Sequence, residues 1–309
     1  MIWRERAGRR RGLSLVEVIV LFVLISAAGL LLVMGIARAR EQARLLGCRK
    51  NLAQIGVALA LYDQFHHQLP GLGPPGAPGG PAAARSPGPL KILLETLELP
   101  DLTELHDPAS RPQRRPGQVP GEIPVPGFVC GSDPKALAGL FPAPISYRAV
   151  TGDNPRGDNG AFAPGRTISL AEVEARDGRS YTAAFSERLV GDNQRGHPAP
   201  HNYQVIPPPL PAGGCPESAD PSSWRGDAGS SWAWCDYRST LYNHALRPFG
   251  HPSCLAADGR TAYMGAASGH VRGVNLLLLD GSVTLVRPSI DLKIWREYAK
   301  VGPPEPEEK

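Results

Sequence analysis

The sequence predicts an α+β protein in which a long N-terminal helix, membrane-embedded in its first half, packs on a mostly antiparallel β-sheet head with long Pro/Gly-rich loops. Three observations predict this fold. An uncharged apolar run from Val18 to Ala37 continues into an apolar stripe at helical spacing. Short segments rich in β-branched and aromatic residues follow, and two of them flank Asp280-Gly281. Gly and Pro supply 35 and 33 of the 309 residues, which indicates many loops without wholesale disorder.

Residues 1–12 form a basic leader with five arginines and one glutamate. The rest of the chain holds 28 basic and 28 acidic residues, so the net charge of +4 belongs to the leader and gives no support to nucleic-acid binding. As a helix, the apolar run 18–37 is about 30 Å long, which is enough to cross a bilayer. The flanking arginines favour a cytoplasmic N-terminus. We therefore expect a single-pass protein of the cytoplasmic (inner) membrane with a periplasmic or other extracytoplasmic head.

Glu17 is unusual in this segment, because a charge inside a membrane helix costs roughly 2.5–3.5 kcal/mol. A plain anchor has no use for it. A secretory signal cleaved near Ser26-Ala27-Ala28 is a second interpretation, but it would leave residues 30–36 as an apolar new N-terminus. A prepilin leader is the third and is favoured. Cleavage after Gly12 would create a charged amine on Leu13 near the Glu17 carboxylate and so compensate the acid.

In this third interpretation the segment resembles the type IV pilin and pseudopilin superfamily. The signature of that superfamily is a basic leader, a Gly, an apolar residue and a Glu five places after the cut, and Gly12, Leu13 and Glu17 fill these positions. The resemblance implies that prepilin peptidase, which is also the N-methyltransferase, cuts after Gly12 and methylates Leu13, while the helix stays in the membrane. It also implies that Glu17 pairs with the amine of an adjacent subunit, which makes it an assembly residue and not a catalyst.

After the membrane run the helix continues, and we expect one helix from about Leu15 to Phe65 within an N-terminal helical segment of residues 13–68, with residues 69–309 as the head. An apolar stripe with alternating spacings of three and four consists of Leu45, Cys48, Leu52, Ile55, Leu59 and Tyr62. A coiled-coil seam is an alternative, but fewer than three heptads are present, so packing on the head is favoured. Pro70 and Gly71 end the helix.

The head combines short strands with loops. Its predicted strands are Phe128–Cys130, Ile145–Val150, Tyr181–Phe185, Val274–Leu279 and Ser282–Val286. The last two should form a hairpin in which Asp280 and Gly281 both have positive φ. The other predicted segments are an exposed Pro/Gly linker at 70–89, a short helix and turn at 90–105, a Pro-rich loop at 111–126, a closing helix at 290–299 and a frayed acidic tail at 303–309.

The resemblance extends over nearly the whole chain. It narrows to a large bacterial group of pilin-like proteins that join a prepilin methylation motif to a head domain of unknown function. The matching segments are Ala39–Arg44, Cys48, Asn51–Gly56, Tyr62, Leu69-Pro70, Phe128–Asp133, Asp158–Gly160, Thr182–Glu187, Thr240–His244, Pro252–Cys254, His270–Val283 and Ile290–Trp295. Two departures stand out. The usual His-Pro-Gly-Gly is here His270-Val-Arg-Gly273, which weakens a ligand role for that loop, and Cys235 has no counterpart.

The five cysteines contain no C-x-x-C pair, which gives little support to a zinc or thioredoxin-like site. Outside the cytoplasm disulfides are the expected state, and the odd count leaves at least one thiol over. The resemblance implies that Cys48 pairs with Cys130, tying the helix to the head, and that Cys215 pairs with Cys254. Cys235 is then the candidate free thiol. The alternative for Cys48 is a small apolar residue on the helix stripe.

Candidate ligand groups are weak. His197 and His201 are four residues apart, but Pro198 and Pro200 exclude the helix that would put both on one face, so a metal site there needs a loop and is the minor alternative. Calcium is the one conceivable cofactor, because related pseudopilins hold calcium in a loop of the head. Its candidate ligands here are the hard oxygen atoms of Asp153, Asn154, Asp158 and Asn159, which are also ordinary turn formers.

Nothing in the sequence indicates catalysis, since no nucleophile elbow, phosphate loop or H-E-x-x-H motif occurs. Glu187 is expected to accept structural hydrogen bonds, and His244 is expected to hydrogen-bond the backbone of the head. The tryptophans Trp224, Trp232 and Trp234 could present a glycan-binding surface, but a place in the core is favoured.

The sequence therefore predicts a pseudopilin-like, membrane-anchored assembly protein that is not an enzyme. The resemblance implies that its partners are prepilin peptidase, other pilin-like subunits and an inner-membrane platform of a type II secretion or type IV pilus-like assembly. The chain is longer than ordinary pseudopilins, which keeps an alternative open. In that alternative the head is a membrane-tethered module that binds glycans or peptides and does not polymerise.

Overall fold

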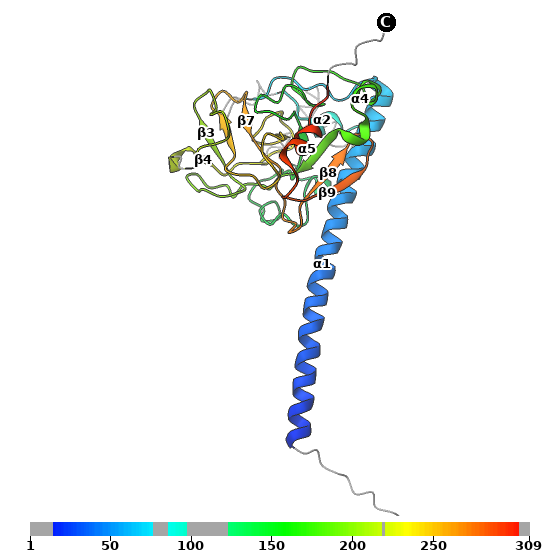
Figure 1. The fold of residues 1–309 in the computed structure, drawn as a ribbon, viewed down its shortest axis with the longest axis vertical. Helices are drawn as coiled ribbons and strands as arrows, with labels where there is room; N and C mark the ends of the chain where they lie inside the picture. Colours follow the sequence, from blue (N-terminus) through cyan, green and yellow to red (C-terminus); the bar gives the residue numbers. More distant parts are fainter. Residues whose placement is uncertain (1–14, 77–85, 98–122, 218–219, 303–309) are drawn as a thin grey trace, which may run out of the picture. The chain divides into compact units, whose positions relative to one another are not determined.

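The structure, a computed structural model, describes residues 15–76, 86–97, 123–217 and 220–302. The chain divides into two compact units, Met1–Ala43 and Arg44–Lys309. Helix α1 (Leu15–His66) belongs to both and matches the helix predicted from about Leu15 to Phe65 (Figure 1). Its residues up to Ala43 therefore belong to one unit and its residues from Arg44 onward to the other.

The remaining elements belong to the head unit. The helices are α2 (Pro89–Ile92), α4 (Leu170–Arg176) and α5 (Leu292–Glu297), with 3₁₀ turns at Pro126–Phe128, Arg179–Tyr181 and Pro221–Ser223. The strands are β1 (Tyr147–Val150), β2 (Ala183–Glu187), β3 (Tyr203–Ile206), β4 (Trp224–Arg225), β5 (Leu241–Tyr242), β6 (Cys254–Ala256), β7 (Ala262–Tyr263), β8 (Val274–Leu278) and β9 (Val283–Val286).

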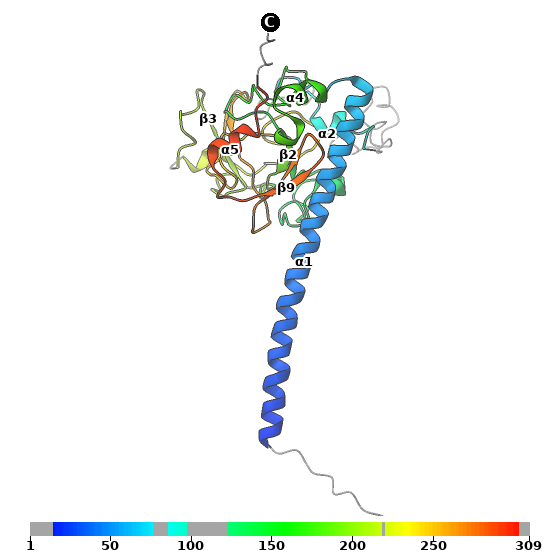
Figure 2. The same cartoon turned by 45° about the vertical axis from the view of Figure 1, so that its right-hand side comes forward.

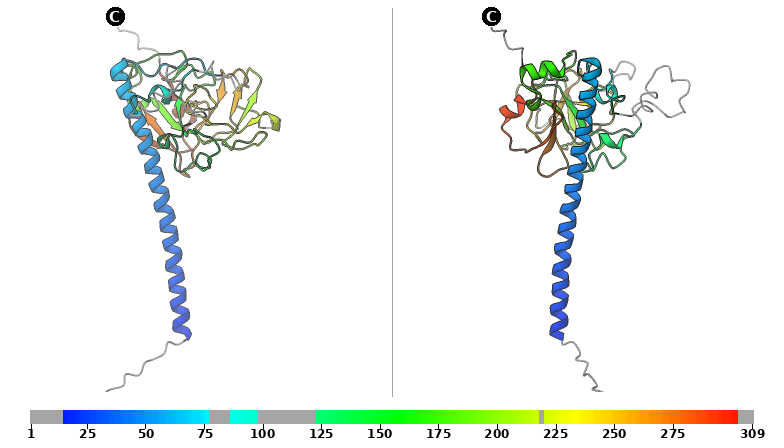
Figure 3. Two further views of the ribbon diagram at one scale, coloured as in Figure 1. Left: turned by 180° about the vertical axis from the view of Figure 1, so that it is seen from behind. Right: turned by 90° about the vertical axis from the view of Figure 1, so that its right-hand side faces the viewer.

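Within the described residues these strands form two mixed sheets, ordered β5-β1-β2-β8-β9 and β4-β3-β6-β7. Only the β1/β5 and β3/β6 ladders are parallel there, and the other pairings are antiparallel. In the head unit, β8 and β9 lie beside the C-terminal part of α1, whereas β3, β4 and β7 lie on the opposite side (Figure 1; Figure 3, left). The α+β class and the mainly antiparallel pairing are confirmed.

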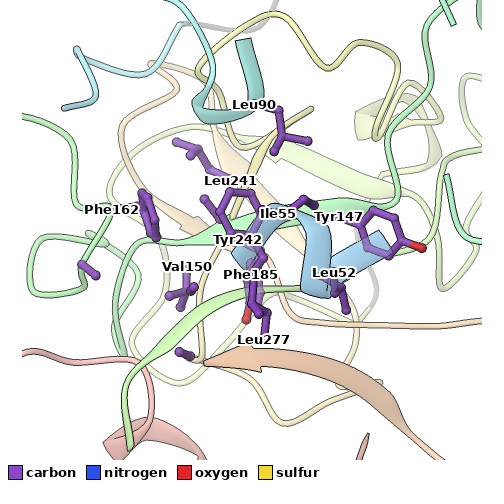
Figure 4. Packing of buried hydrophobic residues seen from close by; sticks show 14 of the residues in the cluster. Leu52, Ile55, Leu90, Tyr147, Val150, Phe162, Phe185, Leu241, Tyr242 and Leu277 are labelled. Carbon is purple, nitrogen blue, oxygen red and sulfur yellow. The ribbon is translucent and has the colours of Figure 1, made fainter. Parts of the chain in front are cut away.

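The part of α1 from Arg44 to His66 buries its apolar stripe against the five-stranded sheet. Cys48, Leu52, Ile55 and Leu59 are at most 2% exposed, and Tyr62 packs at the edge of the same core. Figure 4 shows Leu52 and Ile55 among Tyr147, Phe185 and Leu277. Each such aliphatic side chain contributes about 1.5–3 kcal/mol when it leaves water. The stripe is therefore the helix face of the core and not a coiled-coil seam.

A glycine allows the helix to approach the hairpin closely. A Cβ at Gly56 would lie 3.0 Å from Leu277 Cδ1 and 3.2 Å from Gly281 Cα. Both distances are tighter than ordinary van der Waals contact. The views in Figure 2 and Figure 3 also place β9 next to this part of α1. A larger residue at position 56 would push the helix away from the sheet that covers its stripe.

The β8–β9 hairpin forms as predicted, but its turn is of a different type. Gly281 has a φ of +86°, whereas Asp280 is not among the residues with positive φ. Leu278 donates its N–H to Ser282 O, and Gly281 donates its N–H to Leu278 O. The loop is thus a three-residue turn that closes on a left-handed glycine, so only one of the two positions needs positive φ.

Three further segments differ between the sequence prediction and the structure. Phe128–Cys130 is not a strand, because Pro126 begins a 3₁₀ turn that includes Phe128. Helix α4 was not predicted, although Ser169 and Glu172 form a capping box at its start. The segment 70–89 does not begin as an exposed linker, since Leu72 is 4% exposed and its carbonyl accepts from Gly165 N. Residues 77–85 and 98–122, and the tail at 303–309, lie outside the described residues.

The structure joins Cys48 to Cys130 and Cys215 to Cys254, which is the pairing that the resemblance implied. Their Cα atoms are 5.2 Å and 5.7 Å apart, within the usual range for disulfides. Cys235 is free and buried. Burial raises the pKa of its thiol, so the reactive thiolate is suppressed in the folded protein.

We expect the double variant Cys48→Ala/Cys130→Ala to lose about 4 kcal/mol of unfolding free energy, because the bridge closes a loop with a sequence separation of 82. Thermal unfolding of the detergent-solubilised full chain measures this loss. Cys235→Ala is the matched control and should lower the free energy of unfolding far less, since Cys235 forms no disulfide and so closes no loop. In wild type denatured without reductant, one thiol should be alkylated; alkylation of three or more would contradict the two bridges.

Candidate functional site

The part of α1 from Leu15 to Ala37 presents apolar side chains on all sides. Between Leu15 and Ile36 every large apolar residue is 46–77% exposed. The most apolar window of the helix has a mean hydropathy of 2.9, and none of it is buried. A helix that is apolar all round is covered by lipid or by other helices, not by water. This segment is the candidate site for anchoring and assembly.

Glu17 lies in the first turn of α1, where a negative charge interacts favourably with the helix dipole. Gly12 and Leu13, the predicted processing residues, lie outside the described residues. Further along, Ser26 donates its hydroxyl to Phe22 O at 2.8 Å. That bond satisfies the hydroxyl inside the helix itself, as a membrane segment requires. Glu17 therefore lies in the first turn of the helix, directly before the apolar run that begins at Val18.

In the head, a buried polar cluster ties α1 to the sheet around the Cys48–Cys130 bridge. Both carboxylate oxygens of Glu187 accept from Asn275, one from its backbone N–H and one from its amide, each at 2.9 Å. Arg49 of α1 donates to Asn275 Oδ1 at 3.3 Å. His270 Nε2 lies 3.4 Å from Cys130 Sγ and 3.5 Å from Glu187 Oε1. Glu187 is therefore a structural acceptor, as the sequence indicated.

The predicted calcium residues do come together. Asp153 Oδ1 accepts from the side-chain amides of Asn154 and Asn159, at 3.1 Å and 2.8 Å. Asn154 also donates to Asp158 Oδ1, and Asp158 Oδ2 forms an ion pair with Arg156 at 2.9 Å. These bonds hold the loop as a self-contained turn. Carboxylate oxygen atoms of Asp153 and Asp158 already accept hydrogen bonds from the protein. Calcium binding by this loop stays a prediction.

A second loop brings His197 and His201 together without a helix. Both imidazoles face the carboxylate of Asp192, whose Oδ2 contacts His197 Nδ1 and lies 3.3 Å from His201 Nε2. Burial opposes ionisation of Asp192, but hydrogen bonds from His197, Gln194 and Asn202 outweigh it and hold the pKa of this carboxyl well below its usual range. Sequence reasoning missed Asp192, although it lies five residues before His197.

His244 is fully buried and neutral. Its Nδ1 donates to Trp295 O at 2.6 Å, so Nε2 accepts from the Tyr242 hydroxyl at 2.9 Å. The ring stacks on Trp295 with centroids 3.4 Å apart. Burial lowers the pKa of His244 from 6.5 to about 3. The expectation that His244 hydrogen-bonds the backbone is confirmed.

The tryptophans belong mainly to the core. Trp224 and Trp232 are 6% and 0% exposed, and Trp232 donates its indole N–H to Ile123 O at 2.8 Å. Trp234 is partly buried and packs against the core, with Lys91 Nζ 5.2 Å from its ring centroid. The expectation of core positions is confirmed, and the three indoles do not form an exposed glycan-binding platform.

Fold and site together define the class of protein. In the described part of the chain, one helix is long and apolar enough to cross a membrane, and it lies near the N-terminus. The head contains two disulfides. Both features indicate a membrane-anchored or secreted extracytoplasmic protein.

The family described as "Protein of unknown function (DUF1559)" matches residues 37–293, and the chain belongs to this family. No curated protein and no solved structure matched the chain. The matched range begins at Ala37. The interpretation of residues 12–36 as a pilin-like N-terminus therefore rests on the sequence of the leader and on the apolar helix, and not on the family match.

The buried imidazole of His244 predicts a pH dependence of stability. Because its pKa is about 3 in the folded state and 6.5 otherwise, the unfolded chain takes up a proton first as the pH falls. The stabilisation is complete above pH 6.5 and is lost as the pH drops toward 3, by up to about 1.4 kcal/mol per unit.

His244→Gln should flatten this slope of unfolding free energy against pH, and the exposed-site control His67→Asn should keep it. Chemical unfolding at several acidic pH values measures both slopes. Equal slopes in wild type and in His244→Gln would contradict a neutral buried imidazole.

Proposed function

We propose that this chain is a pseudopilin-like structural protein, a single-pass subunit of the cytoplasmic membrane with an extracytoplasmic head. In this proposal prepilin peptidase removes residues 1–12 after Gly12 and methylates the new N-terminus at Leu13. The helix then remains in the membrane, and Glu17 directs assembly with other pilin-like subunits on a membrane platform. The proposal assigns no catalytic residue and no nucleic-acid partner.

The observation that carries the proposal is an exposed apolar helix with an acid in its first turn. Apolar exposure from Leu15 to Ile36 calls for a lipid or helical environment, in which a carboxylate such as that of Glu17 is costly. Leu13 precedes Glu17 by four residues, the spacing that places two helical residues on one face. A cut after Gly12 would create an amine at that position. A plain anchor leaves the acid without a role.

The disulfides and the leader support the proposed topology. Disulfides persist in oxidising compartments, so Cys48–Cys130 and Cys215–Cys254 favour a head outside the cytoplasm. The five arginines before Gly12 favour a leader that stays inside. The basic leader before the apolar helix and the disulfide-bonded head after it therefore favour the same orientation in the membrane.

Mass spectrometry of the mature N-terminus tests the processing step. We expect the protein isolated from its natural host to begin with methylated Leu13, because the Gly12–Leu13 bond would lie on the cytoplasmic side of the membrane. A Gly12→Ala or Gly12→Val variant should accumulate with its leader attached. A mature chain that begins at Gly29 would support a secretory signal instead, and an intact Met1 would leave a plain tether.

Substitution of Glu17 tests the assembly role. Glu17→Ala should insert into the membrane at least as well as wild type, because it removes a charge that costs roughly 2.5–3.5 kcal/mol in a membrane helix. We expect it to lose cysteine-scanning cross-links between subunits along the apolar run. Glu41→Ala is the matched control, since it removes an acid from the same helix outside that run, and it should keep the cross-links. Normal cross-linking of Glu17→Ala would contradict the assembly role.

A specific observation also favours the alternative of a tethered binding module. The head has a hollow of about 640 Å³ with a largely apolar lining that includes Gly47, Val125, Leu137 and Phe141. Such a hollow suits an apolar peptide segment better than a glycan, because glycan sites rely on exposed aromatic rings. A module of this kind needs only a tether, so it predicts that Glu17→Ala keeps full function.

A further inference from the structure

The Asp192 loop brings three metal-binding side chains to one point in the head. Asp192 Oδ2, His197 Nδ1 and His201 Nε2 all lie within 4.8 Å of one another. They come from three positions of a single loop that leads into β3, with Pro198 and Pro200 between the two histidines. Each proline fixes one backbone φ and so reduces the freedom that the loop must lose to hold this arrangement.

The carboxylate of Asp192 is oriented by its neighbours. Its Oδ1 accepts from Asn202 Nδ2 at 2.9 Å and from Gln194 N at 3.0 Å, which leaves Oδ2 directed at the two imidazoles. The same Asn202 amide donates to His197 O at 2.9 Å and so fixes the loop that carries the histidine. Supporting hydrogen bonds of this kind are typical of metal sites, where they hold the ligand atoms in place.

His201 provides an independent observation. Its Nε2 is buried, and in the described structure its polar contact is the ion pair with Asp192 Oδ2 at 3.3 Å, which is not a well-directed hydrogen bond. A buried nitrogen without a well-directed hydrogen bond lowers the stability of the fold. Coordination of a metal ion by this nitrogen would remove that loss of stability.

The spacing of the donor atoms fits a small tetrahedral ion. Zinc binds nitrogen and oxygen at 2.0–2.1 Å, so two ligand atoms of a tetrahedral site lie about 3.3 Å apart. The distance from Asp192 Oδ2 to His201 Nε2 is 3.3 Å. His197 Nδ1 lies closer to Asp192 Oδ2 and would have to move outward to share the ion. Its side chain is half exposed and has room to do so.

We propose that Asp192, His197 and His201 bind a divalent transition-metal ion, with Zn²⁺ as the first candidate. Two imidazoles and one carboxylate select such ions over calcium and magnesium, which prefer oxygen ligands throughout. His201 also lines a hollow of about 470 Å³ together with Ser132, Lys135 and Leu189. Solvent in this hollow would supply the remaining ligand.

A second group of donor atoms in the head is less suitable. Cys48, Cys130, Glu187 and His270 also converge, and all four are buried. However, the two cysteines are joined in a disulfide, and zinc binds the thiolate. The test must therefore keep the disulfides oxidised, so that this group does not bind.

The proposal is tested on the full chain in detergent, purified with an affinity tag that contains no histidine, stripped with EDTA and kept free of reductant. Calorimetric titration with ZnCl₂ should give one ion per chain with micromolar or tighter affinity. Titration with Co²⁺ should give the strong visible absorption of a four-coordinate ion. His197→Ala and His201→Gln should each weaken zinc binding at least about tenfold. His67→Asn, at an exposed histidine with positive φ that Asn also adopts, should bind as wild type does.

Near-ultraviolet circular dichroism of each variant checks the fold. His197→Ala is decisive, because a half-exposed side chain can be removed without disturbing the core. The proposal is overturned if the wild type binds no zinc in the micromolar range, or if folded His197→Ala keeps the wild-type affinity and cobalt spectrum. Zinc that binds only after reductant is added would place the site at Cys48 and Cys130 and would equally refute the proposal.

Discussion

The whole structure depends on the removal of the apolar surface of α1 from water along its entire length. From Arg44 onward the protein does this itself, because the stripe through Cys48, Leu52, Ile55 and Leu59 faces the five-stranded sheet. From Leu15 to Ile36 no part of the described chain covers the helix, and its apolar side chains remain exposed. A helix needs tertiary or lipid contacts for most of its stability. One continuous element therefore requires two environments, and that requirement points to a membrane-anchored or secreted protein with a folded head.

The head adds polar anchors to this apolar contact, and they specify the register of the helix on the sheet. Asn51 donates to Val129 O and lies 3.3 Å from the Tyr147 hydroxyl, while Arg49 reaches Asn275 of β8. Buried polar groups are stable only when their partners lie at the correct positions. A shift of α1 by one turn would keep an apolar face toward the sheet but would break these bonds and the Cys48–Cys130 bridge. The apolar stripe supplies much of the binding energy, and the polar contacts select one alignment.

Periodic and local features of this fold could be predicted from the sequence, and long-range features could not. Helix α1 was predicted to within one residue at its end, because its apolar period extends over many turns. The β8–β9 hairpin followed from Asp280-Gly281, although the turn type did not. Strands such as β5 and β7 have two residues each, too few to show an alternation, and their existence depends on partners far along the chain. Helix α4 was a different case, since Ser169 and Glu172 gave a readable capping signal that was missed.

The same distinction explains which candidate sites the sequence revealed. The proposed signals for processing and assembly lie in order within residues 12–17, so a linear motif is sufficient to suggest them. The Asp192 group is also local, because its members lie within ten residues of one another. However, Pro198 and Pro200 exclude a helix, so the four-residue spacing that places two helical histidines on one face does not apply here. Only the folded loop shows that His197 and His201 face one carboxylate, and that Asn202 holds this carboxylate in place. A loop site is therefore encoded in the hydrogen bonds that orient its ligands, and these bonds form only when β3 and its neighbours are in place.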